Sequence, residues 1–415
     1  YVGIFEYASP VSEYLRNFNI SLPQIKNIYG ASLIMAMALF PYIFLLTKAH
    51  LGSVGIKVFK AAKSLGDTNI TAIRKVIIPS LWPTIIAGMA LVIFETIADF
   101  GGVSTLRVDT FTVGIYDAWF GYQSYFSATR LAGFLLLFVF LIMFLAKYFG
   151  EKSVHLASKT AETFERIETT PIVRIGMLIF CSLIFIIVFC IPTTQLIVWN
   201  LADSNLNLIS NLQLLINSLI VGLLASVITV FFAIALALSY KHSNILKSSI
   251  LISSSGYAIP GSVISAGLLV GIDYIFDTSI TFYGILGLLM CLSLRFMTPA
   301  FNYISASLSN ISRSAEHALT TLPRDSFKAF KLFYLPQMKP AIFLSLMLVF
   351  IESIKEQPAT LLLRPIGFDT LSTKIYNFTS EGQWEMAAVP SLFLVSMSLI
   401  FVYLINKNID LNRDK

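Results

Sequence analysis

The sequence predicts an all-α membrane protein with many spans, built from two copies of one unit that run in the same direction. Composition is the first reason. Hydrophobic residues make up 56% of the 415, charged residues only 13%, and the mean hydropathy is +0.78, whereas a soluble domain carries about 25% charged residues. The second reason is a basic segment, Lys60 to Pro79, that recurs from His317 to Pro336. Together they indicate a duplicated, polytopic protein.

The duplication extends well beyond the basic segments. With Pro79 placed on Pro336, a shift of 336 − 79 = 257, Leu65 matches Leu322, Pro83 matches Pro340 and Glu95 matches Glu352. After a three-residue insertion, at a shift of 369 − 109 = 260, the matches are Asp109 with Asp369, Thr110 with Thr370, Ile115 with Ile375 and Tyr116 with Tyr376.

The predicted organisation is a first transmembrane domain at 1–150, a solvated linker at 151–171 and a second transmembrane domain at 172–415. Apolar runs predict three spans in the first domain and six in the second: 29–46, 81–98, 131–146, 172–192, 212–240, 250–272, 282–304, 341–354 and 387–405. Tyr29-Gly30 matches Tyr283-Gly284, yet 283 − 172 = 111 residues precede the second marker and 29 − 1 = 28 the first. The first domain is therefore expected to lack its N-terminal helices, roughly 80 to 100 residues at about 20 per span.

Charge predicts the orientation. Lysine and arginine gather in loops that an even number of predicted spans separates, and the chain ends in a basic tail. The positive-inside rule places the linker, the two repeated loops and the C-terminus in the cytoplasm. Because the two copies share this parity, they are parallel and related by a pseudo-two-fold axis along the membrane normal.

The first repeated loop has the chemistry of a helix, a turn and a second helix. Gly66 can take a positive φ and end the first helix, and Asp67, Thr68 and Asn69 are residue types that begin a helix. Ile70, Ile73, Val76 and Ile77 form an apolar stripe. Such a helix either lies on the lipid surface or docks a soluble partner. Two equivalent copies favour a partner with two-fold symmetry.

The spacing of these loops resembles the EAA motif of ABC-importer permeases. The positions that fit are Ala61, Ala62, Gly66, Val76, Ile78 and Pro79 in the first copy, and Ala318, Leu335 and Pro336 in the second. Three departures stand out. Lys60 and His317 occupy the place of the motif's glutamate, with Glu316 one place early, and Pro323 replaces the glycine.

This resemblance implies the type I ABC-importer (MetI-like) fold in a bacterial inner membrane. It implies two partners: a dimer of ABC ATP-binding subunits on the two loops, and a periplasmic or surface substrate-binding protein. Two permease halves in one chain are similar to the ferric-iron permeases and to the thiamine permease. The segment Phe5-Glu6-Tyr7-Ala8-Ser9-Pro10 looks more like the iron branch. Ferric iron is thus the expected cargo, with thiamine, polyamine, sulfate and phosphonate as alternatives.

The sequence predicts a transport subunit rather than an enzyme, with no cofactor and no nucleic-acid partner. Gly150-Glu151-Lys152-Ser153 lacks the spacing of a phosphate-binding loop, so the energy is expected from a separate ATPase. The cysteines and histidines lie in apolar runs or basic loops, where no metal site is expected.

Four carboxylates are candidates for the translocation path: Glu95 and Asp99 in the first copy, and their mates Glu352 and Glu356. Each pair is four residues apart, on one face of a helix, and intramembrane carboxylates indicate function. A ferric ion favours oxygen ligands. The alternative is that these groups pair with Lys355, Arg107 or Arg364. Arg295 is expected to snorkel at an inner helix end.

Two other classes of protein fit parts of the sequence. An ion-coupled secondary transporter would need buried acidic residues but no docking loops. A structural or assembly membrane protein would transport nothing. The paired loops argue against the first, and the polar outer segments against the second.

Overall fold

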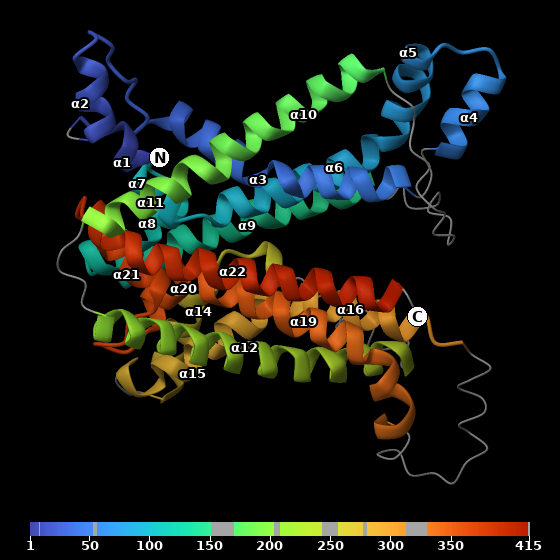
Figure 1. Cartoon of the computed structure of the whole chain (residues 1–415). Helices are drawn as coiled ribbons and strands as arrows, with labels where there is room; N and C mark the ends of the chain where they lie inside the picture. Colours follow the sequence, from blue (N-terminus) through green and yellow to red (C-terminus); the bar gives the residue numbers. More distant parts are fainter. Residues whose placement is uncertain are drawn as a thin grey trace. The chain divides into compact units, whose positions relative to one another are not determined.

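We describe a computed structural model of the chain, which covers residues 1–7, 9–52, 56–150, 170–202, 208–242, 256–276, 280–312 and 330–413. Within these residues every regular element is a helix (Figure 1). The chain forms two compact units. One comprises Tyr1–Thr110 with Gly133–Gln195, and the other Phe111–Ala132 with Leu196–Lys415.

In the first unit, helix α3 (Ile28–His50) packs along α6 (Ile78–Ala98). The N-terminal residues are fixed to a later helix, because the Tyr1 hydroxyl donates a hydrogen bond to the Ile187 carbonyl oxygen at 2.6 Å. The other elements of this unit are α1 (Val2–Phe5), α2 (Pro10–Arg16), α4 (Ile56–Ser64), α5 (Asn69–Ala72), η2 (Ile73–Ile77), α7 (Gly101–Thr105), most of α9 (Tyr125–Gly150), α10 (Pro171–Phe185), η5 (Ile186–Cys190) and the start of α11 (Ile191–Ala202).

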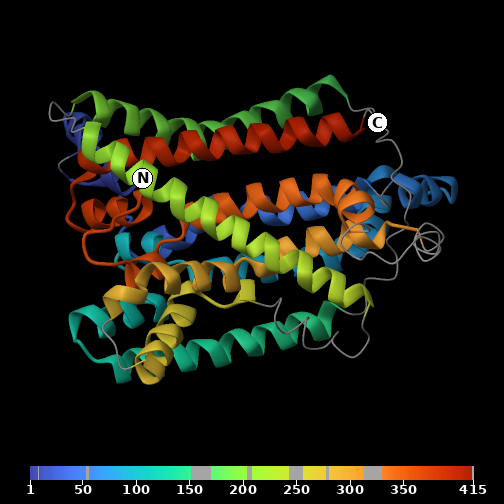
Figure 2. The same cartoon turned by 90° about the horizontal axis from the view of Figure 1, so that it is seen from below.

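The second unit is built around α12 (Leu208–His242), which crosses α16 (Met297–Ser309) and α19 (Leu335–Lys355) and packs on both (Figure 2). Its core is Leu214, Phe350, Ile354, Leu371 and Met397. The other elements are α8 (Phe111–Tyr116), η3 (Asp117–Gly121), η6 (Gly256–Ala258), α14 (Gly261–Phe276), α15 (Ile280–Arg295), η7 (Phe330–Tyr334), α20 (Pro358–Leu363), α21 (Leu371–Ser380) and α22 (Trp384–Arg413).

The helix boundaries confirm the duplication. Helices α6 and α19 begin 335 − 78 = 257 residues apart and end 355 − 98 = 257 apart. Helices α7 and α20 begin 358 − 101 = 257 apart, and α8 and α21 begin 371 − 111 = 260 apart, after the inserted residues. The same local patterns therefore start and stop the same helices in both copies.

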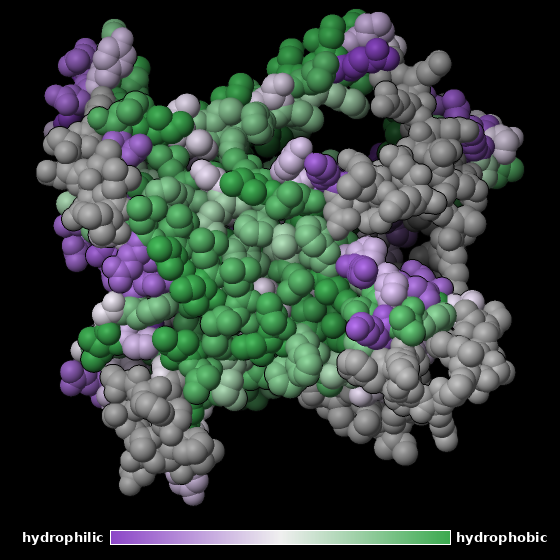
Figure 3. Space-filling model, turned by 60° about the horizontal axis from the view of Figure 1, so that its bottom comes forward, coloured by the Kyte–Doolittle hydropathy of each residue, from purple (hydrophilic) through white to green (hydrophobic). Residues whose placement is uncertain are grey.

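Seven helices among the described residues are long and apolar enough to cross a membrane. Three lie in the first predicted domain, as expected. One expected span, 282–304, is broken: residues Gly284–Arg295 and Met297–Ser309 are bent by 49° at Phe296. Figure 3 shows apolar side chains over the middle of the visible face, with hydrophilic side chains toward its left and right edges. This is the surface of a multi-pass membrane protein.

Candidate functional site: docking loop, helix breaks and paired charges

The first repeated loop folds as a short helix, a glycine turn and a second helix. Helix α4 ends in two hydrogen bonds, from Gly66 N–H to the Lys63 carbonyl and from Asp67 N–H to the Ala62 carbonyl. This pattern requires a left-handed residue after the helix, and Gly66 has φ +94°. The next helix, α5, is capped by Thr68, whose hydroxyl accepts from Thr71 N–H at 3.3 Å. Gly66 thus has its predicted role.

The residues that this loop exposes to solvent agree only in part with the predicted docking surface. Lys60 and Ala61 are exposed, whereas Ala62 is buried. Leu65 and Ile70 are the most exposed apolar side chains of the loop, at 87% and 79%. The apolar stripe is shorter than expected, however. Ile77 is buried, because the loop turns into the membrane helix there.

A π-helical turn leads into the membrane helix in both copies. These turns are η2 and η7, and 330 − 73 = 257 residues separate their starts. Pro79 and Pro336 follow in the first turns of α6 and α19, directly after these π-helical turns. The other predicted docking residues of the second loop, Glu316, His317, Ala318 and Pro323, lie outside the described residues.

In the first copy, the two candidate carboxylates sit at the end of α6. Glu95 is half-buried in the last turns of the helix. Asp99 follows its last residue, and one carboxylate oxygen accepts a hydrogen bond from Val103 N–H at 2.9 Å. Asp99 therefore binds the first turn of α7, where a negative charge is stabilised by the free N–H groups.

In the second copy, Glu356 takes the equivalent position but is buried, with 6% of its surface exposed. Its Oε1 accepts a hydrogen bond from Nη1 of Arg295 at 2.5 Å. Arg295 is also 6% exposed. The expectation that Arg295 snorkels at an inner helix end is therefore wrong. It lies at the break between α15 and α16 and neutralises a buried carboxylate.

The backbone packs closely against this ion pair at Gly261. A Cβ added to Gly261, the first residue of α14, would lie 2.1 Å from Oε1 of Glu356 and 2.6 Å from Nη1 of Arg295. Only a glycine allows this approach. The backbone carbonyl of Glu356 accepts hydrogen bonds from the hydroxyls of Thr360 and Ser372. Three helix boundaries, at Gly261, Phe296 and Glu356, thus meet at one pair of opposite charges.

The remaining charges also pair, partly as expected. Lys355 Nζ lies 2.9 Å from Glu352 Oε1, as the pairing alternative predicted. Arg364 is bonded to Asp369 rather than to a candidate carboxylate. Among the described residues, no three His, Cys, Asp or Glu side chains gather as a metal site.

Two tyrosines that sequence reasoning did not select also meet. Tyr116 ends α8 and Tyr376 lies in α21, and their ring centroids are 5.7 Å apart with the rings at 79°. They are equivalent in the duplication, since 376 − 116 = 260. That match was a usable signal, because residues equivalent in a two-fold repeat come together wherever they lie near the axis.

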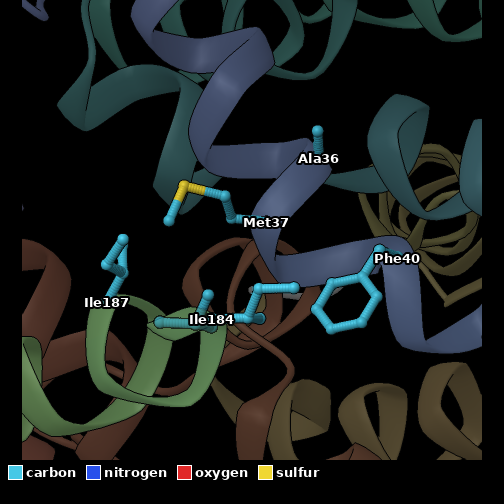
Figure 4. Close-up of a pocket in the computed structure, with 6 residues that line it drawn as sticks. Ala36, Met37, Phe40, Ile184 and Ile187 are labelled. Atoms are coloured by element: carbon cyan, nitrogen blue, oxygen red, sulfur yellow. The ribbon is translucent and has the colours of Figure 1, made fainter. Parts of the chain in front are cut away.

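A pocket of about 240 Å³ lies in the first unit, between α3 and the α10–η5 segment (Figure 4). Its lining side chains are Ala36, Met37, Phe40, Ile184, Ile187 and Val188. All are apolar and give no side-chain oxygen to a cation, so the pocket does not serve a ferric ion.

Comparison with known proteins gives matches to transport permeases. Residues 18–154 match the family described as binding-protein-dependent transport system inner membrane component. The chain is 28% identical over 395 residues to the Fe(3+)-transport system permease protein FbpB 2 of Haemophilus influenzae, which covers 92% of this chain and 77% of that protein.

Shorter stretches match other permeases. The ferric transport system permease protein FbpB of Actinobacillus pleuropneumoniae is 32% identical over 30% of this chain and 18% of its own length. The sulfate transport system permease protein CysT of Salmonella typhimurium is 34% identical over 18% of this chain and 27% of its own. Residues 18–154 thus match a permease family of binding-protein-dependent transport systems, and most of the chain is similar to a permease of this type.

Proposed function

We propose that the chain is the transmembrane subunit that moves ferric iron into the cell, delivered by a binding protein and powered by a separate ATPase dimer. The observation that carries this proposal is the similarity over 92% of the chain to a permease named for Fe(3+) transport. The match to a sulfate permease covers only 18% of the chain and supports the permease class rather than a sulfate cargo.

The two repeated loops support the proposed ATPase dimer as a partner. An ATPase dimer offers two equivalent surfaces, and the chain repeats one loop design in each half. Leu65 and Ile70 project into solvent from the first loop, where apolar side chains are otherwise unfavourable and suit a partner pocket. The π-helical turn between loop and membrane helix is the same in both copies, so a pull on either loop reaches α6 or α19 in the same way.

The orientation and domain boundaries follow from the same loops. We place the loops, the 151–171 linker and the C-terminus in the cytoplasm by the positive-inside rule, with domains at 1–150 and 172–415. The carboxylates Glu95, Asp99, Glu352 and Glu356 then lie near the outer ends of α6 and α19. Oxygen ligands there suit a hard cation that enters from a binding protein.

ATP hydrolysis by the assembled complex tests this proposal. The chain is reconstituted in lipid vesicles with its ATPase, and hydrolysis is measured with the binding protein loaded with iron, free of iron, or absent. The proposal expects stimulation by the iron-loaded protein alone. Equal hydrolysis in the three conditions would mean that the chain does not couple this binding protein to the ATPase.

A further inference from the structure

The contact between Tyr116 and Tyr376 joins two equivalent residues of the duplication. The two rings are in edge-to-face contact. Both residues belong to the same compact unit. A residue that contacts its own repeat mate lies on the two-fold axis that relates the two elements, here α8 and α21.

The position of such an axis matters in a transporter. A passage that two equivalent halves line equally runs along the axis between them. Side chains that meet on the axis therefore either border the passage or close it. Tyr116 and Tyr376 bring two aromatic rings to this place, and these are large enough to close a passage for an ion.

The pair lies at one end of the membrane helices. Helices α6 and α19 each begin at a π-helical turn after a basic loop, and α8 and α21 follow the opposite ends of these helices. Neither tyrosine is part of a candidate span. The pair thus follows the end of α19 that carries Glu356, where a cargo from a binding protein would enter.

The electrostatics of the pair keep both phenols neutral. Burial raises the pKa of Tyr376, and Tyr116 and Asp117 raise it further. Burial also raises the pKa of Tyr116, although Arg364 opposes this shift. Asp369 neutralises Arg364 through their ion pair. Both phenols therefore keep their protons at neutral pH, and the two rings meet without a charge between them.

We propose that Tyr116 and Tyr376 form a paired gate across the cargo path, at the end opposite the docking loops. The gate is closed in this structure. Alternating access requires the two rings to separate once in each transport cycle, so that a cation passes between phenol oxygens from both copies. This inference rests on the proposed function.

A reversible crosslink tests the gate. Cys181, Cys190 and Cys291 are first replaced by alanine, and Tyr116→Cys and Tyr376→Cys are introduced singly and together. The complex in vesicles is treated with a short bis-methanethiosulfonate reagent, and iron uptake is measured before and after a reductant. We expect roughly a tenfold or larger loss in the double variant, restored by the reductant, and little change in the single variants. Unchanged uptake with the crosslink in place would overturn the gate.

A second pair of variants separates the gate from a role in folding. Tyr116→Phe with Tyr376→Phe keeps the ring contact, whereas Tyr116→Ala with Tyr376→Ala removes it. We expect iron to leak into vesicles without ATP in the alanine pair but not in the phenylalanine pair. An alanine pair as tight as the unaltered chain would contradict the gate. If the unaltered chain takes up no iron with ATP and the binding protein, the proposed function fails, and the passive iron leak of the alanine pair then tests the gate by itself.

Discussion

Helices α6 and α19, equivalent in the two copies, both end one residue before a carboxylate, and the two carboxylates have different surroundings. Asp99 is partly exposed and accepts a backbone hydrogen bond from Val103. Glu356 is buried against Arg295. The first copy has no lysine or arginine between Lys26 and Lys48. The residue that matches Arg295, at 295 − 254 = 41, is Pro41, so Asp99 lacks an equivalent arginine from α3.

The difference shows that the duplication preserves the backbone but not the electrostatics. The two copies start and end the same helices, and the second copy fixes its carboxylate in a buried ion pair with Arg295, whereas the matching residue of the first copy is Pro41. A carboxylate already neutralised by arginine is a poor ligand for a cation. We therefore do not expect Glu356 to bind the cargo directly while its pair with Arg295 is intact.

The largest expected effect comes from breaking the buried pair. Arg295→Met leaves Glu356 buried without its partner, which costs about 3–5 kcal/mol of folding stability. Asp99→Asn in the first copy keeps a side-chain oxygen that can still accept the hydrogen bond from Val103 N–H, so it should cost less, about 1 kcal/mol. Thermal unfolding of the purified chain in detergent measures both changes.

A compensating variant completes this comparison. Replacing both residues, as Arg295→Met with Glu356→Leu, removes the uncompensated charge and should recover much of the lost stability. Equal destabilisation by Arg295→Met and Asp99→Asn, or no recovery in the double variant, would show that the ion pair does not distinguish the two copies.

The next largest effect is expected on ATPase binding, from substitutions in the docking loops. Leu65→Asp in the first loop and Leu332→Asp in η7, where Leu332 is 74% exposed, should each weaken ATPase binding by about tenfold or more, since an apolar anchor becomes a buried charge at the interface. Binding is measured by pull-down from detergent. Ile366→Asp is the control, because Ile366 is 92% exposed but lies between α20 and α21. A loss from only one loop would mean that the partner uses the copies unequally.

A smaller effect is expected at the turn of the first loop. Gly66 has φ +94° and free space around it, so any loss on substitution comes from the backbone. Gly66→Val should destabilise the loop by about 1–2 kcal/mol, and Gly66→Asn by less, because asparagine tolerates the left-handed region. Protease cleavage within the loop reports the change. Equal cleavage of the two variants would count against a backbone origin.

The smallest effect on stability is expected at Glu352. Its pair with Lys355 is partly exposed, so Glu352→Gln should change unfolding by no more than about 1 kcal/mol. Combined with Glu95→Gln it should still lower iron uptake, because both copies then lose a carboxylate near the path. ATPase binding is the control and should not change. Unaltered uptake would remove both residues from the mechanism.

The sequence predicted the features that depend on local pattern. Hydropathy predicted membrane helices, and Gly66 predicted the end of a helix. The repeat predicted matching boundaries for α6 and α19. Each follows from residues close together in the chain, or from two stretches compared directly.

The features it did not predict depend on contacts between distant segments. Arg295 and Glu356 are 356 − 295 = 61 residues apart, and an arginine within an apolar run is equally compatible with snorkelling. The break at Phe296 comes three residues before Pro299, which cannot donate a hydrogen bond to the Arg295 carbonyl, so this proline was a usable signal for the bend. Tyr116 and Tyr376 matched in the repeat, but only the packing of α8 with the second copy's helices brings them into contact.

Uptake of labelled ferric iron tests the central claim most directly. Vesicles holding the chain with its ATPase receive the iron-loaded binding protein, with and without ATP inside the compartment that the ATPase faces. We predict iron accumulation that needs both ATP and the binding protein, and no accumulation of labelled thiamine or sulfate under the same conditions. Accumulation of thiamine or sulfate in place of iron, or iron uptake driven by an ion gradient without ATP, would contradict the account.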